Sequence, residues 1–247
     1  MSDAVSEHMS EQELREDLAA AFRMLDRHGM SDLTNGSVVA RLPGADWYLT
    51  HPHGKHFHEM CASDFVAVNM DGTPVNPGDV VNLAVTRPAK AIFAARPEVN
   101  AVIHAHGQGI MGVAALNCGL LPLCEAAMPF YEDVGYVRGD FYFDDDYIAE
   151  IAEKLGPHKA LIYRHHAFAV VGTTIPEAFY FAFQLNVACE VQMKVMACGS
   201  EFMNVPSPEE ARAHRDAFFA DGWVADGSME WPGLRRQLDA EGSSYKA

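Results

Sequence analysis

The sequence has few positive charges and few cysteines, and it has no long apolar run. Lys and Arg number 18 against 34 Asp and Glu, so the formal net charge is −16 over 247 residues. That charge repels a phosphate backbone and argues against a nucleic-acid partner. No stretch approaches the roughly 20 consecutive apolar residues of a membrane-spanning helix. We therefore expect neither a nucleic-acid partner nor a membrane partner.

The cysteines are too few and too scattered for a disulfide framework. There are five of them, an odd number, and none shows CxxC spacing. Such cysteines are typical of reduced thiols. The first residues are polar and acidic, without the basic start and apolar core of a secretory signal. Both observations predict a cytoplasmic protein.

The sequence predicts a single domain. A length of 247 residues is ordinary for a single core, and we find no repeat and no shift of composition. We expect a flexible tail over residues 1–9 and a single domain over 10–247. The domain ends in a C-terminal tail.

Helix starts are marked by capping residues. Ser10 with Glu13 forms a capping box before an apolar helical pattern that ends at Gly29. Similar starts occur at Thr174, before a long apolar helix, and at Ser207. A further short helix is expected from Pro88 to about Ala95, because proline suits a first helical turn.

Six short apolar or alternating runs predict strands. Two of them flank a turn-like Pro-Gly-Ala-Asp sequence and predict a hairpin. Strands mixed with helices favour a layered α/β domain with a mixed or largely antiparallel sheet. The predicted strands are residues 38–42, 47–50, 65–69, 101–106, 160–163 and 168–171.

Two histidines, His104 and His106, are the strongest candidates for chemistry. Residues two apart on a strand point to the same face, so both imidazoles can converge on one point. The glycines that follow, Gly107 and Gly109, place the pair at the open end of a buried strand. Neighbouring buried histidines are costly unless something uses their nitrogens, and a divalent metal does. The alternative to a metal site is that both rings only form hydrogen bonds with the backbone.

A second pair, His165 and His166, directly follows another predicted buried strand. One of these rings would complete a three-histidine site with an open position, as catalytic zinc requires. Adjacent strand residues face opposite ways, so at most one of the two should ligate. Three neutral imidazoles would leave the metal its full +2 charge and make it a strong Lewis acid.

A third group of histidines follows the strand that ends at Thr50. His51, His53, His56 and His58 lie in a segment with Pro and Gly that could bind an anion or a metal. The alternative is a solvated loop, which we favour for His56 and His58.

Glu125 is an acidic candidate inside the otherwise apolar stretch 120–129. A carboxylate there is either buried with a partner or takes part in the chemistry. The sequence contains no Gly-rich phosphate loop, no GxSxG motif and no Rossmann fingerprint.

With these residues placed, the chain resembles the class II aldolase/adducin-like family, which includes fuculose-phosphate aldolase and ribulose-phosphate 4-epimerase. The likeness runs from about Leu14 to Val205, and the tail from Trp231 to Tyr245 resembles the adducin-like branch. The arginine-proline run that leads into His104 is its most specific part. The matching segments are residues 36–37, 50–54, 96–106, 164–167 and 174–178.

The resemblance implies a three-layer α/β/α sandwich around a mainly antiparallel sheet. It also implies a homotetramer with sites between subunits. One divalent metal ion per subunit is implied, commonly zinc, with iron or manganese as alternatives. Its ligands would be His104, His106 and His166, and His165 stands where the family usually has Asn.

Other family positions map less closely. The phosphate-binding Asn and Thr of the family fall on Ser37 and His53, and Gly54 follows as a further substrate-binding candidate. The family's C-terminal segment reaches over a site, which gives Tyr245 or Arg235 that role here.

One catalytic position of the family is missing. Sugar-phosphate aldolases have a Ser-Ser-Glu run whose Glu is a ligand or an acid/base. Counting back from Arg96 puts that Glu near Val85, and no carboxylate lies within residues 80–95. The missing carboxylate and the changed phosphate positions argue against a sugar-phosphate substrate.

We therefore predict a divalent-metal-dependent lyase. It would cleave a C–C bond of a small hydroxy-carbonyl or carboxylate substrate by retro-aldol reaction or decarboxylation, through a metal-stabilised enolate. The proton donor or acceptor would be Glu125, Tyr131 or His165. Apolar and aromatic residues at positions 128, 130, 131 and 168 favour a hydrophobic or aromatic acid as substrate.

Two other functions stay open. A three-histidine site could hold Fe(II) with positions left for O₂ and substrate, as in a mononuclear non-haem iron oxygenase on this fold. A non-catalytic, adducin-like binding protein with a decayed metal site is the other alternative. The presence of all three histidines argues against that last function.

Overall fold

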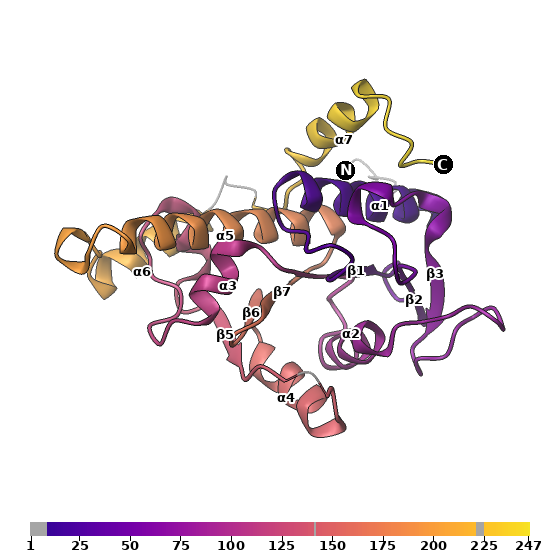
Figure 1. The fold of residues 1–247 in the computed structure, drawn as a ribbon, viewed down its shortest axis with the longest axis horizontal. Helices are drawn as coiled ribbons and strands as arrows, with labels where there is room; N and C mark the ends of the chain where they lie inside the picture. The colour runs from indigo at the N-terminus through magenta and orange to yellow at the C-terminus, as the bar shows by residue number, and fades with distance from the viewer. Residues whose placement is uncertain (1–8, 141, 221–224) are drawn as a thin grey trace, which may run out of the picture.

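The structure, a computed structural model of the protein, describes residues 9–140, 142–220 and 225–247. Helices surround a seven-stranded sheet (Figure 1). The strands are β1 (Ser37–Ala40), β2 (Trp47–Thr50), β3 (Val66–Asn69), β4 (Ala101–Ala105), β5 (Val134–Val137), β6 (Ala160–Tyr163) and β7 (Ala167–Gly172). The α-helices are α1 (Glu11–Arg27), α2 (Leu83–Ala95), α3 (Gln108–Ala114), α4 (Asp145–Leu155), α5 (Ile175–Met196), α6 (Pro208–Phe218) and α7 (Trp231–Ala240). Short 3₁₀ turns are η1 (Phe57–Glu59), η2 (Ala62–Asp64), η3 (Glu125–Phe130) and η4 (Ser200–Phe202).

The sheet order is β3-β2-β1-β4-β7-β6-β5. Neighbouring strands are antiparallel except β5 and β6, which are parallel. The predicted mixed, mainly antiparallel sheet and the hairpin of β1 and β2 are thus confirmed. β4 lies in the middle of the sheet, paired with β1 and β7, so the end of β4 lies beside both neighbouring strands.

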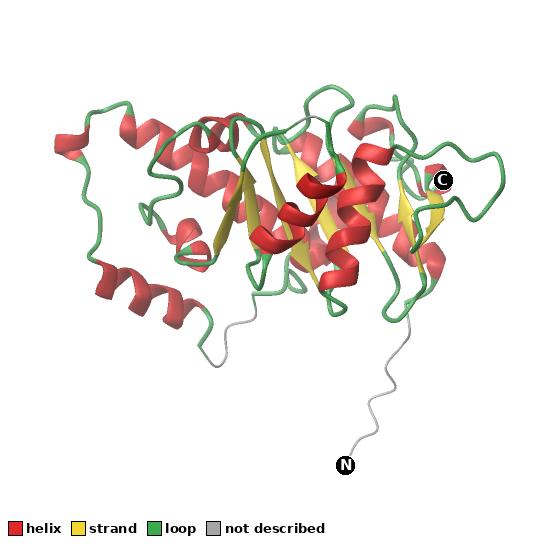
Figure 2. Ribbon diagram, turned by 90° about the horizontal axis from the view of Figure 1, so that it is seen from below, coloured by secondary structure: helices red, strands yellow, loops and turns green. Residues whose placement is uncertain are grey.

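Two apolar clusters, one on each face of the sheet, make this a three-layer α/β/α sandwich. The larger packs against α1, α3 and α5, and the smaller packs against α2 and α4. Figure 1 shows α1 and α5 above the sheet with α2 and α4 below it. The view from below shows the strands side by side with helices in front of and behind them (Figure 2).

The three helix starts predicted from capping residues are present, and at the start of α5 the Thr174 side chain accepts from the N–H of Glu177. Ser10 and Glu13 cap α1, and Ser207 and Glu210 cap α6, with side chain and backbone bonds in both directions. These bonds satisfy N–H groups that a helix start otherwise leaves without partners.

The predicted start of α2 at Pro88 is wrong. The helix begins at Leu83, where the side chain of Asn82 accepts a 3.0 Å hydrogen bond from the backbone N–H of Ala84. Pro88 therefore lies inside the helix, where it lacks one backbone donor. The helix end at Ala95 is as predicted.

The C-terminal segment packs on α1. The indole nitrogen of Trp231 and the guanidinium of Arg235 both donate to a carboxylate oxygen of Asp17, at 3.0 and 2.8 Å. Tyr245 is fully buried, and its carbonyl accepts from the N–H of Ala62. Most of the predicted tail, residues 1–8, lies outside the described residues.

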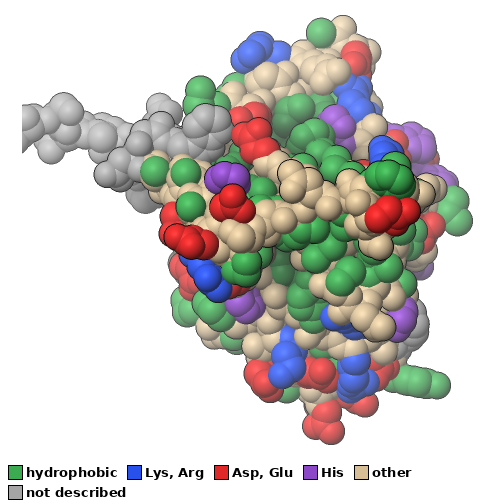
Figure 3. Space-filling view, turned by 90° about the vertical axis from the view of Figure 1, so that its left-hand side faces the viewer, with side chains coloured by type: hydrophobic (Ala, Val, Ile, Leu, Met, Phe, Trp, Pro, Cys, Tyr) green, Lys and Arg blue, Asp and Glu red, His purple; other side chains and the backbone are tan. Residues whose placement is uncertain are grey.

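Some apolar surface remains on the side of the molecule that carries α6 and the end of α5. Hydrophobic side chains gather in the middle of this side, between charged groups (Figure 3). No helix within the described residues combines the length and apolar character that crossing a bilayer demands.

Candidate metal centre

Three imidazoles converge at one end of the sheet. His104 is in β4, His106 directly follows it, and His166 lies in the tight turn between β6 and β7. One ring nitrogen of each lies within 4.8 Å of the others. The Nε2 atoms of His106 and His166 are 3.0 Å apart. The antiparallel pairing of β4 with β7 brings the turn beside the end of β4, so two distant parts of the sequence supply one cluster.

The environment keeps these rings neutral. Burial lowers the pKa of His104 well below its usual value, and the neighbouring His106 and His166 lower it further. Burial also lowers the pKa of His106, and it lowers that of His166 to about 4. A neutral imidazole has a nitrogen lone pair, which is the form that binds a metal.

One contact fixes the orientation of His104. Its Nδ1 lies 2.9 Å from the backbone carbonyl oxygen of Phe168. A carbonyl only accepts, so Nδ1 carries the proton and donates, which leaves the lone pair on Nε2. Such a second hydrogen bond is a common support of metal-binding histidines.

The cluster fits a first-row divalent ion. Zinc–nitrogen bonds of about 2.0–2.1 Å in tetrahedral geometry put two ligand nitrogens about 3.4 Å apart. The observed 3.0 Å between His106 and His166 is close to that value, and the 4.8 Å limit for the whole set needs only small side-chain movements. An all-nitrogen donor set suits zinc or iron better than calcium, magnesium or manganese, which prefer oxygen.

A cavity of about 370 Å³ opens onto the three histidines. Five histidines, Asn82 and the 32–36 loop supply its polar lining, and α2, α3 and Phe143 supply its apolar lining. No Lys or Arg occurs among the described residues that line it, and Asp32 is the one carboxylate among them. The lining is Asp32, Thr34, Asn35, Gly36, His53, Asn82, Ala84, Val85, His104, His106, Met111, Phe143, His165 and His166.

Asp32 was not among the residues singled out from the sequence. Asn35 holds it in place: its backbone N–H donates to the Asp32 carbonyl at 2.8 Å and its side chain to the carboxylate at 3.1 Å. The negative charge of Asp32 also raises the pKa of His106, although burial has the larger, opposite effect. The carboxylate is therefore close enough to influence the cluster.

Three residues predicted from the sequence lie at the cavity or next to it. His53 and His165 are exposed and line it. Ser37 is paired with His104 in the sheet and lines a small space behind that ring. Gly54 is exposed beside His53, with a left-handed φ of 90°, and does not line the cavity.

Which of His165 and His166 joins the cluster is determined by the turn that holds them, not by the alternation of side chains along a strand. Both residues lie between β6 and β7, not on a strand. His165 adopts a left-handed φ of 59° and is exposed, whereas the ring of His166 faces those of His104 and His106. One of the two thus joins the cluster, as expected, but for a different geometrical reason.

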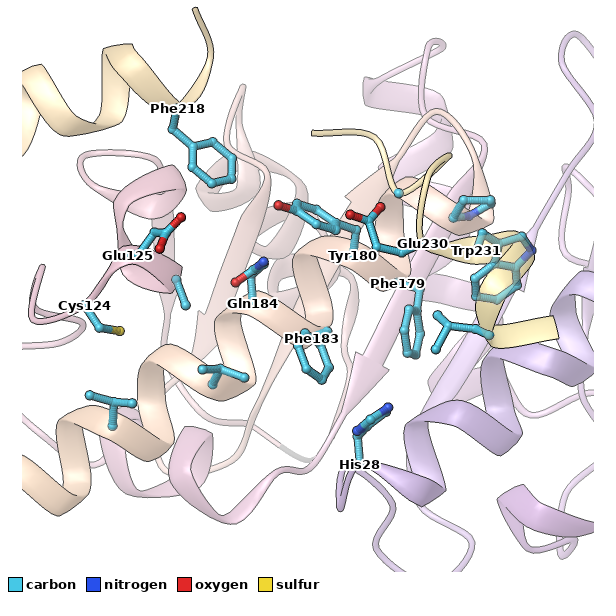
Figure 4. A pocket seen from close by; sticks show the side chains of 16 residues that line it. His28, Cys124, Glu125, Phe179, Tyr180, Phe183, Gln184, Phe218, Glu230 and Trp231 are labelled. Carbon is cyan, nitrogen blue, oxygen red and sulfur yellow. The ribbon is translucent and has the colours of Figure 1, made fainter. Parts of the chain in front are cut away.

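Glu125 and Tyr131 lie outside this cavity. Glu125 is exposed at the start of η3, so of the two alternatives given for it, burial with a partner does not hold, and a part in the chemistry stays a prediction. In a 3₁₀ turn a single side chain can face solvent beside half-buried neighbours, which composition alone does not reveal. Glu125 lines a different cavity (Figure 4). The carbonyl of Tyr131 accepts from Arg215 of α6.

Tyr245 and Arg235 do not reach over the cavity of their own chain. The Tyr245 hydroxyl accepts a 3.3 Å bond from Arg235, which also pairs with Glu16 and Asp17. In this chain both residues fix α7 on α1. Of the remaining histidines, His51 is buried, and His56 and His58 are exposed as expected of a loop.

Comparisons with known proteins agree with this architecture. Residues 16–193 match the Class II Aldolase and Adducin N-terminal domain. Alpha-adducin of Rattus norvegicus is 34% identical over 202 residues, which cover 79% of this chain and 27% of the adducin. The chain therefore spans about a quarter of the length of that relative.

Two solved structures resemble nearly the whole chain. An aldolase II superfamily protein from Pseudomonas syringae has a TM-score of 0.89 and 29% identity, covering 99% of this chain and 98% of its own. An L-fuculose 1-phosphate aldolase from Glaciozyma antarctica has a TM-score of 0.83 and 27% identity, covering 96% and 93%. From the fold, the histidine cluster and these matches, the chain belongs to the class II aldolase and adducin family.

Proposed function

We propose that this protein is a divalent-metal-dependent lyase that cleaves a C–C bond of a small hydroxy-carbonyl or carboxylate substrate. The observation that carries the proposal is the set of three neutral imidazoles at a cavity of about 370 Å³. His104, His106 and His166 would hold the ion. Bound there, it would supply Lewis-acid stabilisation of negative charge that develops on substrate oxygen.

The other residues of the cavity provide binding and proton transfer. Asn35 and Asn82 offer amide groups that can hydrogen-bond substrate hydroxyls or carbonyls. Asp32 is the group to which we assign proton transfer. In a retro-aldol reaction its carboxylate would take the proton of the substrate hydroxyl as the C–C bond breaks and a carbonyl forms. It thereby replaces the carboxylate missing from α2.

The lining favours a substrate without a phosphate group. No Lys or Arg among the described lining residues is available to pair with a phosphate, and Asp32 would repel one. Val85, Met111 and Phe143 offer an apolar wall instead. These residues replace the Met128 and Tyr131 that the sequence suggested as apolar surroundings, and they keep a hydrophobic acid as the preferred class.

A non-catalytic function is the second candidate, favoured by the 34% identity to alpha-adducin. In that case the histidines would have no functional metal. The two functions are separated by metal content, measured on protein purified without added metal.

For the lyase we expect close to one equivalent of zinc, manganese or iron per chain. His106→Ala and His166→Ala should lose it, whereas the matched neighbour variant His165→Ala should keep it. Metal content that is unchanged in the first two variants would remove the basis of the proposal. Iron together with substrate-dependent oxygen uptake would indicate an oxygenase instead.

Activity is then tested with a panel of hydroxy-keto acids, by the release of aldehyde or CO₂. Asp32→Asn should retain the metal and lose about 10²–10⁴-fold in turnover, the usual contribution of a general base. If Asp32→Asn turns over at the wild-type rate, the proton transfer belongs to another group.

A further inference from the structure

A second and larger cavity lies away from the histidine cluster. Its volume is about 640 Å³, within the range of small-molecule sites. It is bounded by α5, η3 and the start of α7, and shares no lining residue with the metal cavity. Figure 4 shows aromatic rings from several elements around it, among them Phe179, Phe183, Phe218 and Trp231.

Two carboxylates are the charged groups of this otherwise apolar lining. Glu125 comes from η3 and Glu230 immediately precedes α7, and both are exposed. Within the described part of the chain neither has a hydrogen bond or ion pair to a cationic side chain. In Figure 4 Gln184 and Tyr180 lie between the two carboxylates. An acidic pair beside aromatic rings is thus left without a positive partner.

The remaining titratable groups do not offset this charge. No Lys or Arg is among the described lining residues. His28 is packed edge-on against Phe183, with ring centroids 4.9 Å apart. Burial lowers the pKa of His28, and Arg27 lowers it further, so the ring is neutral near pH 7. The cavity therefore carries about two negative charges, in a protein whose net charge is −16.

We propose that this cavity binds an amphipathic amine, a small aromatic or aliphatic group that carries one ammonium. The apolar part would pack on Phe179, Phe183 and Trp231, and the ammonium would pair with Glu230, which directly precedes Trp231. Aromatic faces also attract cations directly, which favours an ammonium over a neutral polar group. An apolar carboxylate would be repelled by both glutamates.

The charge pattern also favours this occupant over an apolar surface of a second copy. Covering the cavity with an apolar helix would remove Glu125 and Glu230 from water without giving them a partner. Unpaired buried charges are strongly unfavourable. An amine pairs with Glu230 while it fills the apolar space, and it leaves Glu125 open to water.

The test compares three probes of equal length that differ in charge: 4-phenylbutylammonium, 4-phenylbutanol and 4-phenylbutyrate. Binding to the full chain is measured by isothermal titration calorimetry at low and at high salt. We expect the ammonium to bind about tenfold more tightly than the carboxylate, because an exposed ion pair with Glu230 strengthens the ammonium by about two- to fivefold and repulsion weakens the carboxylate by a similar factor. This preference should shrink at high salt. Equal or tighter binding of the carboxylate, or no binding of any probe, would overturn the proposal.

Variants separate the charge from the apolar surface. Glu230→Gln should weaken the ammonium by about two- to fivefold, Glu125→Gln should weaken it by less, and both should leave the alcohol unchanged. Glu153→Gln, an exposed change on α4 at the opposite face of the sheet, is the matched control. Phe183→Ala should weaken all three probes.

Sedimentation of the wild type and of Phe183→Ala tests whether a second copy of the chain covers this cavity instead. If the wild type self-associates, Phe183→Ala dissociates it and the ammonium does not bind, the cavity is an interface between copies and the proposal is wrong. Because 4-phenylbutyrate also belongs to the substrate class proposed for the metal cavity, the titrations are repeated in His106→Ala. Binding that persists in this variant belongs to the second cavity, so the outcome does not depend on the proposed lyase activity.

Discussion

At the scale of single residues, His51 combines deep burial with the absence of a hydrogen bond. It is 4% exposed beside the ring of Phe22, and no partner of its Nδ1 is found among the described residues. Burial lowers its pKa to about 4, so the native state holds the neutral ring. His51 thus couples folding to pH without belonging to the metal cluster.

This coupling predicts that His51 lowers the free energy of unfolding in acid. The unfolded chain binds a proton at His51 near pH 6.5 and the native state only near pH 4. Between these values the unfolded state holds more protons, so stability falls as pH falls from about 6.5 to about 4. The share due to His51 between pH 7 and pH 5 is about 2 kcal/mol.

The measurement is urea unfolding of wild type and His51→Leu at both pH values. The loss of stability between pH 7 and pH 5 should be about 2 kcal/mol smaller in the variant. His56→Ala, an exposed neighbour, should behave as the wild type does. An equal loss in His51→Leu and wild type would show that the His51 ring is solvated.

The sequence predicts some residues of the site better than others, for reasons of geometry. His104 and His106 were identifiable because alternation on a buried strand fixes where two side chains point. Asp32 was not, because it lies in an exposed loop without periodicity and reaches the cavity only through its bonds with Asn35. The exposure of Glu125 was not predictable, because apolar neighbours do not determine the direction of a side chain in a 3₁₀ turn.

At the scale of elements, the contact between α3 and α5 positions the site. α3 begins directly after His106 and Gly107, so a shift of this helix moves a predicted ligand. Gly109 lies against the backbone of α5, where an added Cβ would come within 2.6 Å of the Glu190 nitrogen. The N–H of Gly109 also donates to the Glu190 carboxylate at 2.8 Å.

Gly109→Ala should therefore destabilise the fold by about 1–3 kcal/mol, the usual cost of overpacking, and weaken zinc binding. Gly112→Ala is the matched control on the same helix, because its Cβ would meet only the flexible side chain of Met193. Thermal unfolding and zinc titration of both variants provide the measurement. Similar effects of the two substitutions would mean that the close backbone approach does not matter.

The attachment of α7 to α1 depends on Asp17, which is 4% exposed. Its carboxylate accepts from Trp231 and Arg235, while burial raises its pKa. Asp17→Ala leaves the Trp231 indole without its acceptor and takes one of two carboxylate partners from Arg235, which keeps Glu16. It should cost about 2–3 kcal/mol, reduced from the full value of a buried pair because Arg235 is partly exposed. Asp17→Asn, which keeps an acceptor, should cost less.

Urea unfolding measures the stability of both variants. Glu11→Ala, which removes the surface ion pair with Arg15, serves as the control, and its free energy of unfolding should change by no more than about 0.5 kcal/mol. A stability of Asp17→Ala equal to that of the control would show that α7 is held by apolar contacts alone.

The elements themselves were predictable where the pattern was strong. The predicted strands are present, with ends shifted by at most two residues. β5 was missed because it has four residues with a glycine among them, Gly135, which weakens the signal of a strand. That glycine is required by packing, since a Cβ would lie 2.0 Å from the carbonyl oxygen of Lys154.

At the scale of the whole molecule, the metal would join parts of the sheet that are far apart in sequence. His104 lies in β4 and His106 directly follows it, whereas His166 belongs to the β6–β7 turn some sixty residues later. The cluster exists only when β4 and β7 are paired, so the unfolded chain offers no equivalent site. An ion that binds the native state alone must stabilise the entire fold.

Zinc at 100 times its dissociation constant should add about 2.7 kcal/mol to the free energy of unfolding. For a chain of this size that corresponds to a rise in Tm of about 5–10 °C. The rise should be reversed by a chelator and absent in His106→Ala, while His165→Ala should show all of it. Differential scanning calorimetry of the three proteins, with zinc and with chelator, is the measurement. A wild-type Tm that does not respond to zinc, manganese or iron would mean that the three imidazoles do not form a metal site, and a full rise in His106→Ala would place the ion elsewhere.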